Sequence, residues 1–132
     1  MVSLSYQKGY VADLNYNLFN LPPVLNGNVI TNINLSSLAN PPIFNYRSPT
    51  FTDPESDALV FTFEGLANQS LISANQVDTN AFMITADQRK ITSLDNDKIY
   101  SLKVTLNEQG KTEPSWTTTI QVNLSYVQLE NH

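Results

Sequence analysis

The chain has 132 residues, which is enough for one domain with a continuous core and too few for two well-buried domains. Hydrophobic residues make up 41% and charged residues only 14%, a composition too apolar and too weakly charged for a disordered segment. The net charge of -5 and the scatter of the 7 Lys and Arg residues exclude a phosphate-tracking surface, so no nucleic-acid partner is expected.

Residues 1–21 form an N-terminal segment that we interpret as the tail of a preceding repeat or as a linker. Leu14-Asn15-Tyr16 in this segment is matched by Leu124-Ser125-Tyr126 near the other end of the chain. A similar pair of segments about one domain apart indicates tandem repetition. The sequence therefore predicts a domain over residues 22–127 and a C-terminal tail over residues 128–132.

Short apolar stretches predict the early strands. Strands are expected at Val29–Leu35 and Ile43–Tyr46, and a clearer one at Leu59–Phe63, where large apolar residues recur at every second position. Residues 66–74 are the only stretch with a weak helical pattern, and their Asn and Ser residues favour a loop or a single turn. Further short strands are predicted at Phe82–Thr85 and around Ile91.

The last two predicted strands carry the clearest alternation. Even-numbered residues from Tyr100 to Leu106 and from Trp116 to Tyr126 are mostly apolar, whereas the odd-numbered residues are mostly polar. This pattern is typical of half-buried strands with the apolar face inward. Residues 107–114 contain Gly110 and Pro114 and predict a hairpin loop. Several short strands separated by Pro, Asn and Asp predict an all-β fold, a Greek-key β-sandwich of about seven strands.

Residues 51–61 read Phe-Thr-Asp-Pro-Glu-Ser-Asp-Ala-Leu-Val-Phe. They are similar to the Phe-x-Asp-Pro-(acidic)-Gly-Asp-x-Leu-x-(aromatic) signature of the dystroglycan-type cadherin-like domain. Pro22-Pro23-Val24, Phe44-Asn45-Tyr46 and residues 99–105 resemble further parts of that family. The resemblance implies a cadherin/immunoglobulin-like β-sandwich in a larger repeat protein. It also implies an extracellular or cell-surface location, with neighbouring repeat domains or another protein as partners.

The chain departs from the family pattern around its acidic residues. Ser56 stands where the family has Gly, and Glu108 falls where the family has an Asp after its Tyr-x-Leu-x-Val strand. The Asp-x-Asn-Asp-Asn linker of calcium-dependent cadherins is absent, since residues 19–27 contain no carboxylate. The resemblance therefore does not extend to calcium-bound repeat junctions.

Asp53, Glu55 and Asp57 recur at every second position, a spacing that in a loop directs several oxygens at one hard cation. Glu108 is the fourth candidate calcium ligand, and Asp95 and Asp97 are further carboxylates that could complete the shell. An alternative interpretation is structural, with Asp53-Pro54 as an Asx-type turn and Asp57 as a cap of the next strand. Ala58 occupies the position where an EF-hand requires Gly, which excludes that motif.

The aromatic residues are assigned mainly structural roles. Asp95-Asn96-Asp97 ahead of Tyr100 predicts a tyrosine corner, in which a Tyr hydroxyl bonds to backbone upstream. Trp116 and Tyr126 share the inward parity of their strand, which favours burial over stacking against a sugar. The remaining tyrosines of the N-terminal segment are free to form an interface: Tyr6, Tyr10 and Tyr16.

Several kinds of chemistry lack the residues they need. The chain has no cysteine, and its single histidine is the last residue, His132, so thiol chemistry, a Ser-His-Asp triad and a multi-histidine zinc site are excluded. No run approaches the roughly 18 apolar residues of a membrane span.

From the missing catalytic residues and the family resemblance we expect no enzyme, but a structural or adhesion module that mediates protein contact or spacing, assisted by calcium. The alternative is an accessory carbohydrate-binding module with a glycan as partner.

Overall fold

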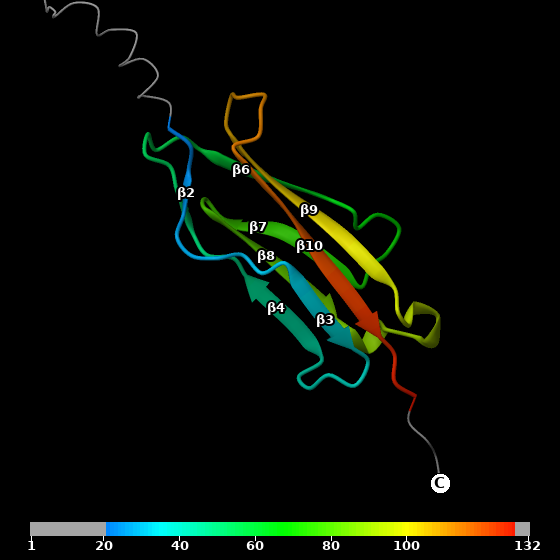
Figure 1. The fold of residues 1–132 in the computed structure, drawn as a ribbon. Coiled ribbons are helices and arrows are strands. Elements are labelled where there is room, and N and C mark those ends of the chain that lie inside the picture. Colours follow the sequence, from blue (N-terminus) through cyan, green and yellow to red (C-terminus); the bar gives the residue numbers. More distant parts are fainter. Residues whose placement is uncertain (1–20, 129–132) are drawn as a thin grey trace, which may run out of the picture.

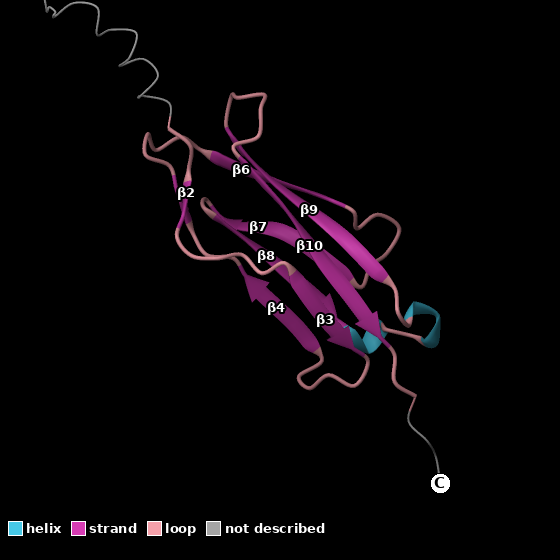
Figure 2. Ribbon diagram, viewed as in Figure 1, coloured by secondary structure: helices cyan, strands magenta, loops and turns pink. Residues whose placement is uncertain are grey.

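The computed structural model describes residues 21–128. These residues form strands and two short 3₁₀ turns, and no helix among them is long and apolar enough to cross a membrane (Figure 2). The elements in chain order are β2 (Val24–Leu25), β3 (Asn32–Ser36), β4 (Ile43–Arg47), β5 (Phe51–Thr52), β6 (Leu59–Glu64), β7 (Ile72–Asp78), β8 (Ala81–Asp87), η1 (Gln88–Lys90), η2 (Ser93–Asp95), β9 (Ile99–Glu108) and β10 (Trp116–Ser125).

The longer strands form two sheets. One sheet has the order β3-β10-β9-β6 and the other β4-β8-β7, while the two-residue strands β2 and β5 pair with each other. The chain crosses between the sheets four times, from β3 to β4, from β4 to β6, from β6 to β7 and from β8 to β9, and β3 pairs in parallel with β10, the last strand. This connectivity is a Greek-key sandwich of the immunoglobulin/cadherin kind. The seven longer strands confirm the predicted fold class.

The core lies between the sheets and follows the alternation of the sequence. Leu102, Val104 and Leu106 on β9 are fully buried, as are Ile120 and Val122 on β10. These two strands pair in an antiparallel register that aligns their inward residues, and the hairpin loop between them is where the sequence predicts it. Other strands complete the core with Ile33, Leu35, Phe51, Leu59, Phe61, Ile72, Phe82, Ile84 and Ala86.

Two local predictions are wrong. Residues 72–74, the end of the stretch 66–74 in which the sequence favours a loop or a turn, belong to the seven-residue strand β7, whereas residues 66–71 lie outside any strand. This strand pairs with β8 over nearly its full length, so tertiary pairing overrides the turn-forming preference of its Ser and Asn residues. Ile91 is not in a strand: it follows the 3₁₀ turn η1 and is buried singly against the core.

The two ends of the described chain lie at opposite poles of the sandwich. In Figure 1 the chain comes in beside β2, at the same pole as the loop between β9 and β10, and leaves at the far end of β10. The segment interpreted as the tail of a preceding repeat, including Tyr6, Tyr10 and Tyr16, lies outside the described residues except for Leu21.

The side chain of Gln76 joins the open edges of the two sheets. It extends from β7, an edge strand, to β6, the edge strand of the other sheet. Its Oε1 accepts a hydrogen bond from the Phe61 amide at 3.0 Å, and its Nε2 donates to the Leu59 carbonyl at 3.1 Å. Gln76 thus satisfies backbone groups of β6 that a neighbouring strand would otherwise pair.

Replacing Gln76 by Ala is expected to lower the free energy of unfolding by about 1–2 kcal/mol, because a donor and an acceptor on β6 lose their partner. Equilibrium urea denaturation measures this change. Gln121→Ala is the matched control, since Gln121 lies exposed on β10, and its effect should stay within about 0.5 kcal/mol. Equal unfolding midpoints for the two variants would show that the amide bridge contributes nothing.

Candidate metal centre

Four carboxylates meet at the pole where the chain comes in. Three of them, Asp53, Glu55 and Asp57, belong to the loop between β5 and β6. The fourth, Glu108, is the last residue of β9, and the pairing of β6 with β9 sets it opposite Leu59, directly after that loop. The strand register therefore brings a residue from far along the sequence to the acidic loop.

The acidic loop is folded around the Asp53 side chain. Its carboxylate accepts hydrogen bonds from the backbone amides of Glu55 and Asp57, and its carbonyl accepts one from Ser56 at 2.9 Å. Ser56 has a φ of 61°, in the left-handed region where glycine is favoured. The predicted Asx-type turn and the acidic cluster are thus both present.

Each of the four carboxylates offers one oxygen, and these oxygens all lie within 4.8 Å of one another. Asp53 is 9% exposed and Glu108 is 6% exposed, while Glu55 and Asp57 are half-buried. The structure therefore brings together all four residues that the sequence nominates as calcium ligands. Their use as ligands stays a prediction.

Two carboxylate oxygens in the cluster are buried without a hydrogen-bond partner among residues 21–128: Glu55 Oε1 and Glu108 Oε2. The other oxygen of each group is occupied. Glu55 Oε2 accepts from the Leu21 amide at 3.0 Å, and Glu108 Oε1 accepts from the Ser115 hydroxyl at 3.1 Å and lies 3.9 Å from Lys111 Nζ. A buried, unpaired carboxylate oxygen is costly, and a shared cation would satisfy both oxygens.

The environment of Glu108 raises the pKa of its carboxyl above the ordinary value for glutamate. Burial is the main cause, and the nearby carboxylates of Asp57 and Asp53 add to it. The Ser115 hydroxyl and Lys111 act in the opposite direction, more weakly than burial but more strongly than the two aspartates. A proton and a divalent cation would therefore compete for this group.

The raised pKa predicts how stability depends on pH in the presence of a chelator. The folded chain holds a proton on Glu108 more tightly than the unfolded chain does. The free energy of unfolding should therefore fall as pH rises from the ordinary glutamate value of about 4.5 through the raised folded value. Thermal melts over this range should show that decline in the wild type and lack it in Glu108→Gln. The same slope in both proteins would assign it to another group.

The donor set suits a hard cation. All four side chains offer carboxylate oxygens, and no Cys or His lies among residues 21–128. Calcium takes six to eight oxygen ligands in flexible geometry, whereas soft or borderline metals prefer sulfur and nitrogen. The four carboxylates would fill part of a calcium shell and leave positions for other oxygens.

Asp95 and Asp97 cannot complete this shell, which corrects one expectation. They precede the first residue of β9, Ile99, whereas Glu108 is its last. Ten strand residues span roughly 33 Å, so these residues and the cluster lie at opposite poles. Asp95 instead caps η2: its Oδ2 accepts from the Thr92 amide at 2.9 Å, which is the main cause of its lowered pKa.

Asp95→Ala is expected to lower the free energy of unfolding by about 1 kcal/mol, because the Thr92 amide and hydroxyl lose their acceptor. Urea denaturation measures the loss. Lys98→Ala removes only the exposed ion pair with Asp95 and should change stability by less than about 0.5 kcal/mol. A loss as large in Lys98→Ala would assign the stabilisation to the ion pair instead of the cap.

The predicted tyrosine corner is absent among the described residues. The Tyr100 hydroxyl has no hydrogen-bond partner within residues 21–128, although its side chain packs against the core. The turn before it bonds to the end of β10 instead. The Asn96 side chain accepts from the Tyr126 amide at 2.9 Å, and the Asp97 amide donates to the Leu124 carbonyl at 3.0 Å.

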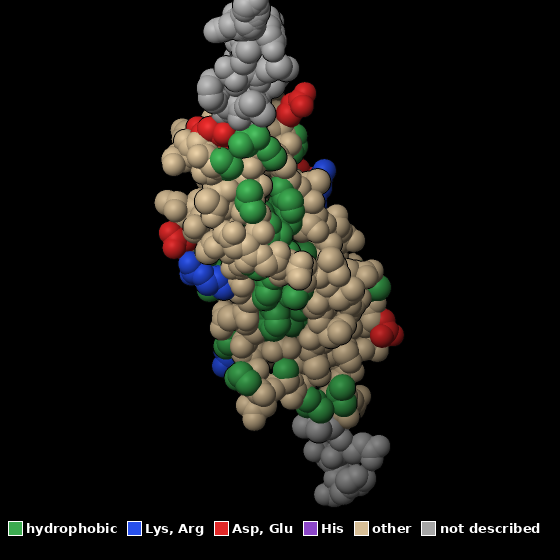
Figure 3. All heavy atoms as spheres, turned by 60° about the vertical axis from the view of Figure 1, so that its left-hand side comes forward, with side chains coloured by type: hydrophobic (Ala, Val, Ile, Leu, Met, Phe, Trp, Pro, Cys, Tyr) green, Lys and Arg blue, Asp and Glu red, His purple; other side chains and the backbone are tan. Residues whose placement is uncertain are grey.

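Trp116 at the start of β10 and Tyr126 just after its end follow the inward parity that the sequence indicates. Trp116 and Tyr126 are half-buried and pack against the core. The Trp116 ring lies edge-on to the ring of Phe51, with 4.9 Å between centroids. On the face drawn in Figure 3, acidic side chains gather at the pole of the incoming chain, and hydrophobic side chains form a broken row along its length.

No known family profile and no curated protein matches this chain. Among solved structures, it is similar to the endo-fucoidan hydrolase MfFcnA4 of glycoside hydrolase family 107, with 21% identity and a TM-score of 0.49. That match covers 80% of this chain and 14% of the hydrolase. It is also similar to the titin M3 domain, with 11% identity and a TM-score of 0.47, over 82% of this chain and 99% of that domain.

A third similar structure is the mouse clustered protocadherin PcdhgC3 EC1-3, with 11% identity and a TM-score of 0.44. That match covers 83% of this chain and 34% of the protocadherin fragment. The chain thus spans only a small part of the hydrolase and about a third of the protocadherin fragment. Its strand order, burial and register make it an immunoglobulin/cadherin-like β-sandwich module.

Proposed function

We propose that this chain is a non-catalytic spacer or adhesion module of a larger repeat protein, of the dystroglycan-type cadherin-like kind, and that calcium stiffens its incoming pole. The single observation that carries the proposal is the position of the two chain ends at opposite poles of the sandwich (Figure 1). A module with this arrangement extends a string of repeats along the strand direction. Neighbouring repeats or another protein would be its partners.

The acidic cluster supports a role for an ion at the junction. Glu55 belongs to the cluster, and its Oε2 accepts a hydrogen bond from the Leu21 amide, at the start of the described chain. An ion held by the four carboxylates of the cluster would fix the Glu55 carboxylate, which accepts the hydrogen bond from the Leu21 amide. Ion binding would thereby order the chain that leads into the domain.

The proposed calcium ion also favours an extracellular location for the module. Extracellular modules bind calcium at roughly 10⁻⁴–10⁻³ M, and we assign this range to a site built mainly from one loop, with two of its four carboxylates half-buried. We therefore place the module outside the cell or at its surface.

A tandem fusion of two copies of the chain tests the spacer role by small-angle X-ray scattering. The expected result in calcium is an elongated particle whose distance distribution has a second maximum, one module length from the first. In a chelator the second maximum should broaden, because the junction loses order. A compact particle with the two copies side by side would contradict the proposal.

Glu55→Gln is the sharpest variant for this experiment. The glutamine keeps an oxygen that can accept from the Leu21 amide but lowers the negative charge available to an ion. The variant fusion should therefore behave in calcium as the wild type behaves in chelator. Glu64→Gln, an exposed change at the other end of β6, should leave the scattering unchanged.

A further inference from the structure

The large apolar side chains that remain exposed gather at the two ends of the sandwich. Nine of them are exposed within residues 21–128, and each lies outside the strands or at one of the first or last two positions of a strand. Five belong to the pole where the chain leaves, which we call the exit pole: Leu38, Ile43, Leu94, Ile99 and Val127. Four belong to the incoming pole: Leu21, Val24, Val60 and Val77. Exposed apolar side chains that gather in this way mark interaction surfaces.

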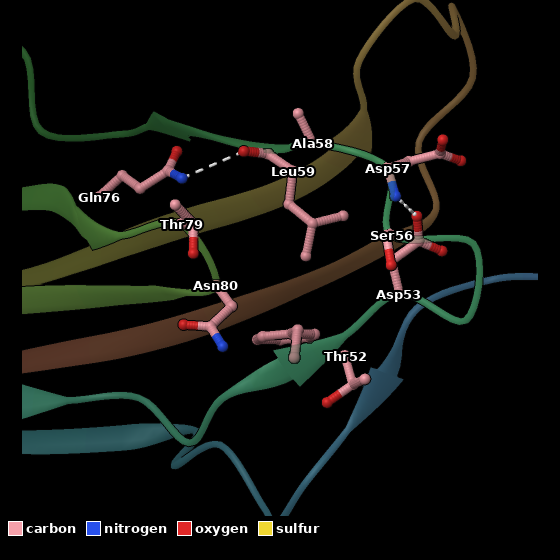
Figure 4. Close-up of a pocket in the computed structure, with 10 residues that line it drawn as sticks. Thr52, Asp53, Ser56, Asp57, Ala58, Leu59, Gln76, Thr79 and Asn80 are labelled. Carbon is pink, nitrogen blue, oxygen red and sulfur yellow. Dashed lines mark hydrogen bonds between the residues drawn. The ribbon is translucent and has the colours of Figure 1, made fainter.

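The positions of the strand residues follow from the pairing of the strands. Figure 4 shows the Gln76 side chain bonded to the Leu59 carbonyl, directly after the acidic loop. Val77 and Val60 are the next residues of the two strands, so they lie at the incoming end. Ile99 lies at the exit end, because it is the first residue of β9 and the last residue of that strand belongs to the acidic cluster.

Hydrogen bonds join the segments of the exit pole into one surface. The turn after β3 is bonded to the chain after β10, since the Val127 amide donates to the Ser37 hydroxyl at 2.8 Å, and Leu38 follows directly. The loop that contains η2 is bonded to the same stretch, since the Asn96 side chain accepts from the Tyr126 amide at 2.9 Å. Three separate segments of the sequence therefore present their apolar side chains together.

Leu94 is the most prominent side chain of the exit pole, with 84% of its surface exposed. It lies in the 3₁₀ turn η2, which is fixed by reciprocal bonds between Thr92 and Asp95. A side chain on a fixed turn loses less conformational freedom on association than one on a free loop. Leu94 is therefore well suited to anchor a contact with another surface.

The charges of the two poles favour a contact between unlike poles. The incoming pole carries the four carboxylates of the acidic cluster, with Lys111 beside Glu108. Residues 87–98 of the exit pole, around η1 and η2, carry three basic and three acidic side chains and are neutral as a group. Two incoming poles would repel each other, whereas an incoming pole meets no excess of negative charge at an exit pole.

The spacing of the sequence would bring unlike poles of successive modules together. Leu14-Asn15-Tyr16 matches Leu124-Ser125-Tyr126, and Leu21, the first described residue, lies five positions after Tyr16. A following module of the same kind would then begin five positions after Tyr126. Five residues span at most about 18 Å, which is much less than the roughly 33 Å of a ten-residue strand. The incoming pole of that module would therefore be held next to the exit pole of this one.

We infer that the exit pole packs against the incoming pole of a following module of the same kind, with Leu94 as the main apolar anchor and Val24 on the opposing surface. The inference rests on the repeat arrangement of the proposed function and makes the neighbouring repeat the partner of the exit pole. A contact between two different surfaces of the same module does not close on itself, so it continues along a string of modules. The packed junction would set a fixed angle between neighbours.

The test joins residues 1–130 of one copy directly to residues 21–132 of a second copy, so that residues 127–130 take the place of residues 17–20. The chain has no cysteine, so Thr119→Cys in each copy places one spin label on the exposed face of each β10. Double electron–electron resonance in calcium then measures the distribution of distances between the two modules. A packed junction gives one narrow distribution, and this is the expected result.

Each variant is made in one copy at a time, because only one of its two positions lies at the junction. Leu94→Ser in the first copy should broaden the distribution, since the contact loses its main apolar side chain. The same change in the second copy, at a free exit pole, should leave the distribution narrow. Val24→Ser should act in the opposite order, with its effect in the second copy only. The paired positions control for any effect of a substitution on the folding of its own module.

Each other outcome rejects a defined claim. A broad distribution of long distances, the same in the wild type and in all four variants, rejects the packed junction and leaves the spacer role standing. A short distance, with the two copies side by side, rejects the inference together with the proposed function. Equal broadening by Leu94→Ser in either copy rejects Leu94 as a junction residue. Dimers of the single chain in sedimentation, lost in Leu94→Ser, would assign the exit pole to a contact with a second exit pole instead.

Discussion

Millimolar calcium is expected to raise the melting temperature of the wild-type chain and to leave that of Glu108→Gln unchanged. A ligand that binds only the folded state at a hundred times its dissociation constant adds about 2.7 kcal/mol to the free energy of unfolding. For a domain of this size, each kcal/mol corresponds to about 4 °C. Thermal melts in calcium and in chelator measure the shift.

The physical reason lies in the buried, unpartnered Oε2 of Glu108 and its acidic neighbours. Calcium would satisfy this oxygen and neutralise the repulsion between Glu108 and the carboxylates of Asp57 and Asp53. Glutamine removes the charge that the ion needs but keeps an oxygen for the Ser115 hydroxyl. In chelator, Glu108→Gln should therefore be at least as stable as the wild type, because the cost of burying a charge is gone and the smaller effect of the neighbouring aspartates goes with it.

Glu64→Gln is the matched control for this prediction. It removes one negative charge from the exposed end of β6, away from the acidic loop, and should keep the full calcium shift. Equal calcium shifts in the wild type and Glu108→Gln would contradict the assignment of Glu108 as a ligand. No shift in any of the three proteins would remove the ion site altogether.

The sequence allowed the sandwich to be predicted where one face of a strand is buried. The alternation on β9 and β10 fixes both the inward residues and the register, since a slip of one residue would expose Leu102 and Ile120. The acidic loop could be predicted because Asp53, Glu55 and Asp57 are so close in sequence that a turn brings their side chains together. Glu108 required the family resemblance, and its position then follows from its pairing opposite Leu59.

The features that escaped prediction depend on long-range contacts. β7 carries Ser73, Asn75 and Gln76, which favour turns in isolation, and it becomes a strand because β8 pairs with it. The role of Gln76 at the sheet edge depends on β6, which the sequence does not place beside it. Asp95 and Asp97 resemble Glu108 in charge and in their nearness to β9 in the sequence, but the full length of β9 separates them from it.

Gly65→Ala is expected to be the most destabilising of the substitutions considered, at about 2–5 kcal/mol. Gly65 follows β6 with a φ of +107°, and a Cβ at this position would lie 2.0 Å from the Ser101 carbonyl oxygen on β9. The positive φ alone costs about 1–2 kcal/mol for a residue with a side chain. The clash with a backbone atom requires β6 and β9 to move apart, at a further cost of about 1–3 kcal/mol.

Gly110→Ala separates the two contributions. Gly110 also has a positive φ, +85°, but no atom lies within 4 Å of a Cβ built there. This variant should lose only the conformational part, about 1–2 kcal/mol, and the difference between the variants in urea denaturation measures the clash. Equal losses would show that the end of β6 shifts freely. Because Gly65 and Leu59 lie at opposite ends of β6, the calcium affinity of Gly65→Ala should match the wild type, which would separate the stability of the sandwich from the chemistry of its acidic pole.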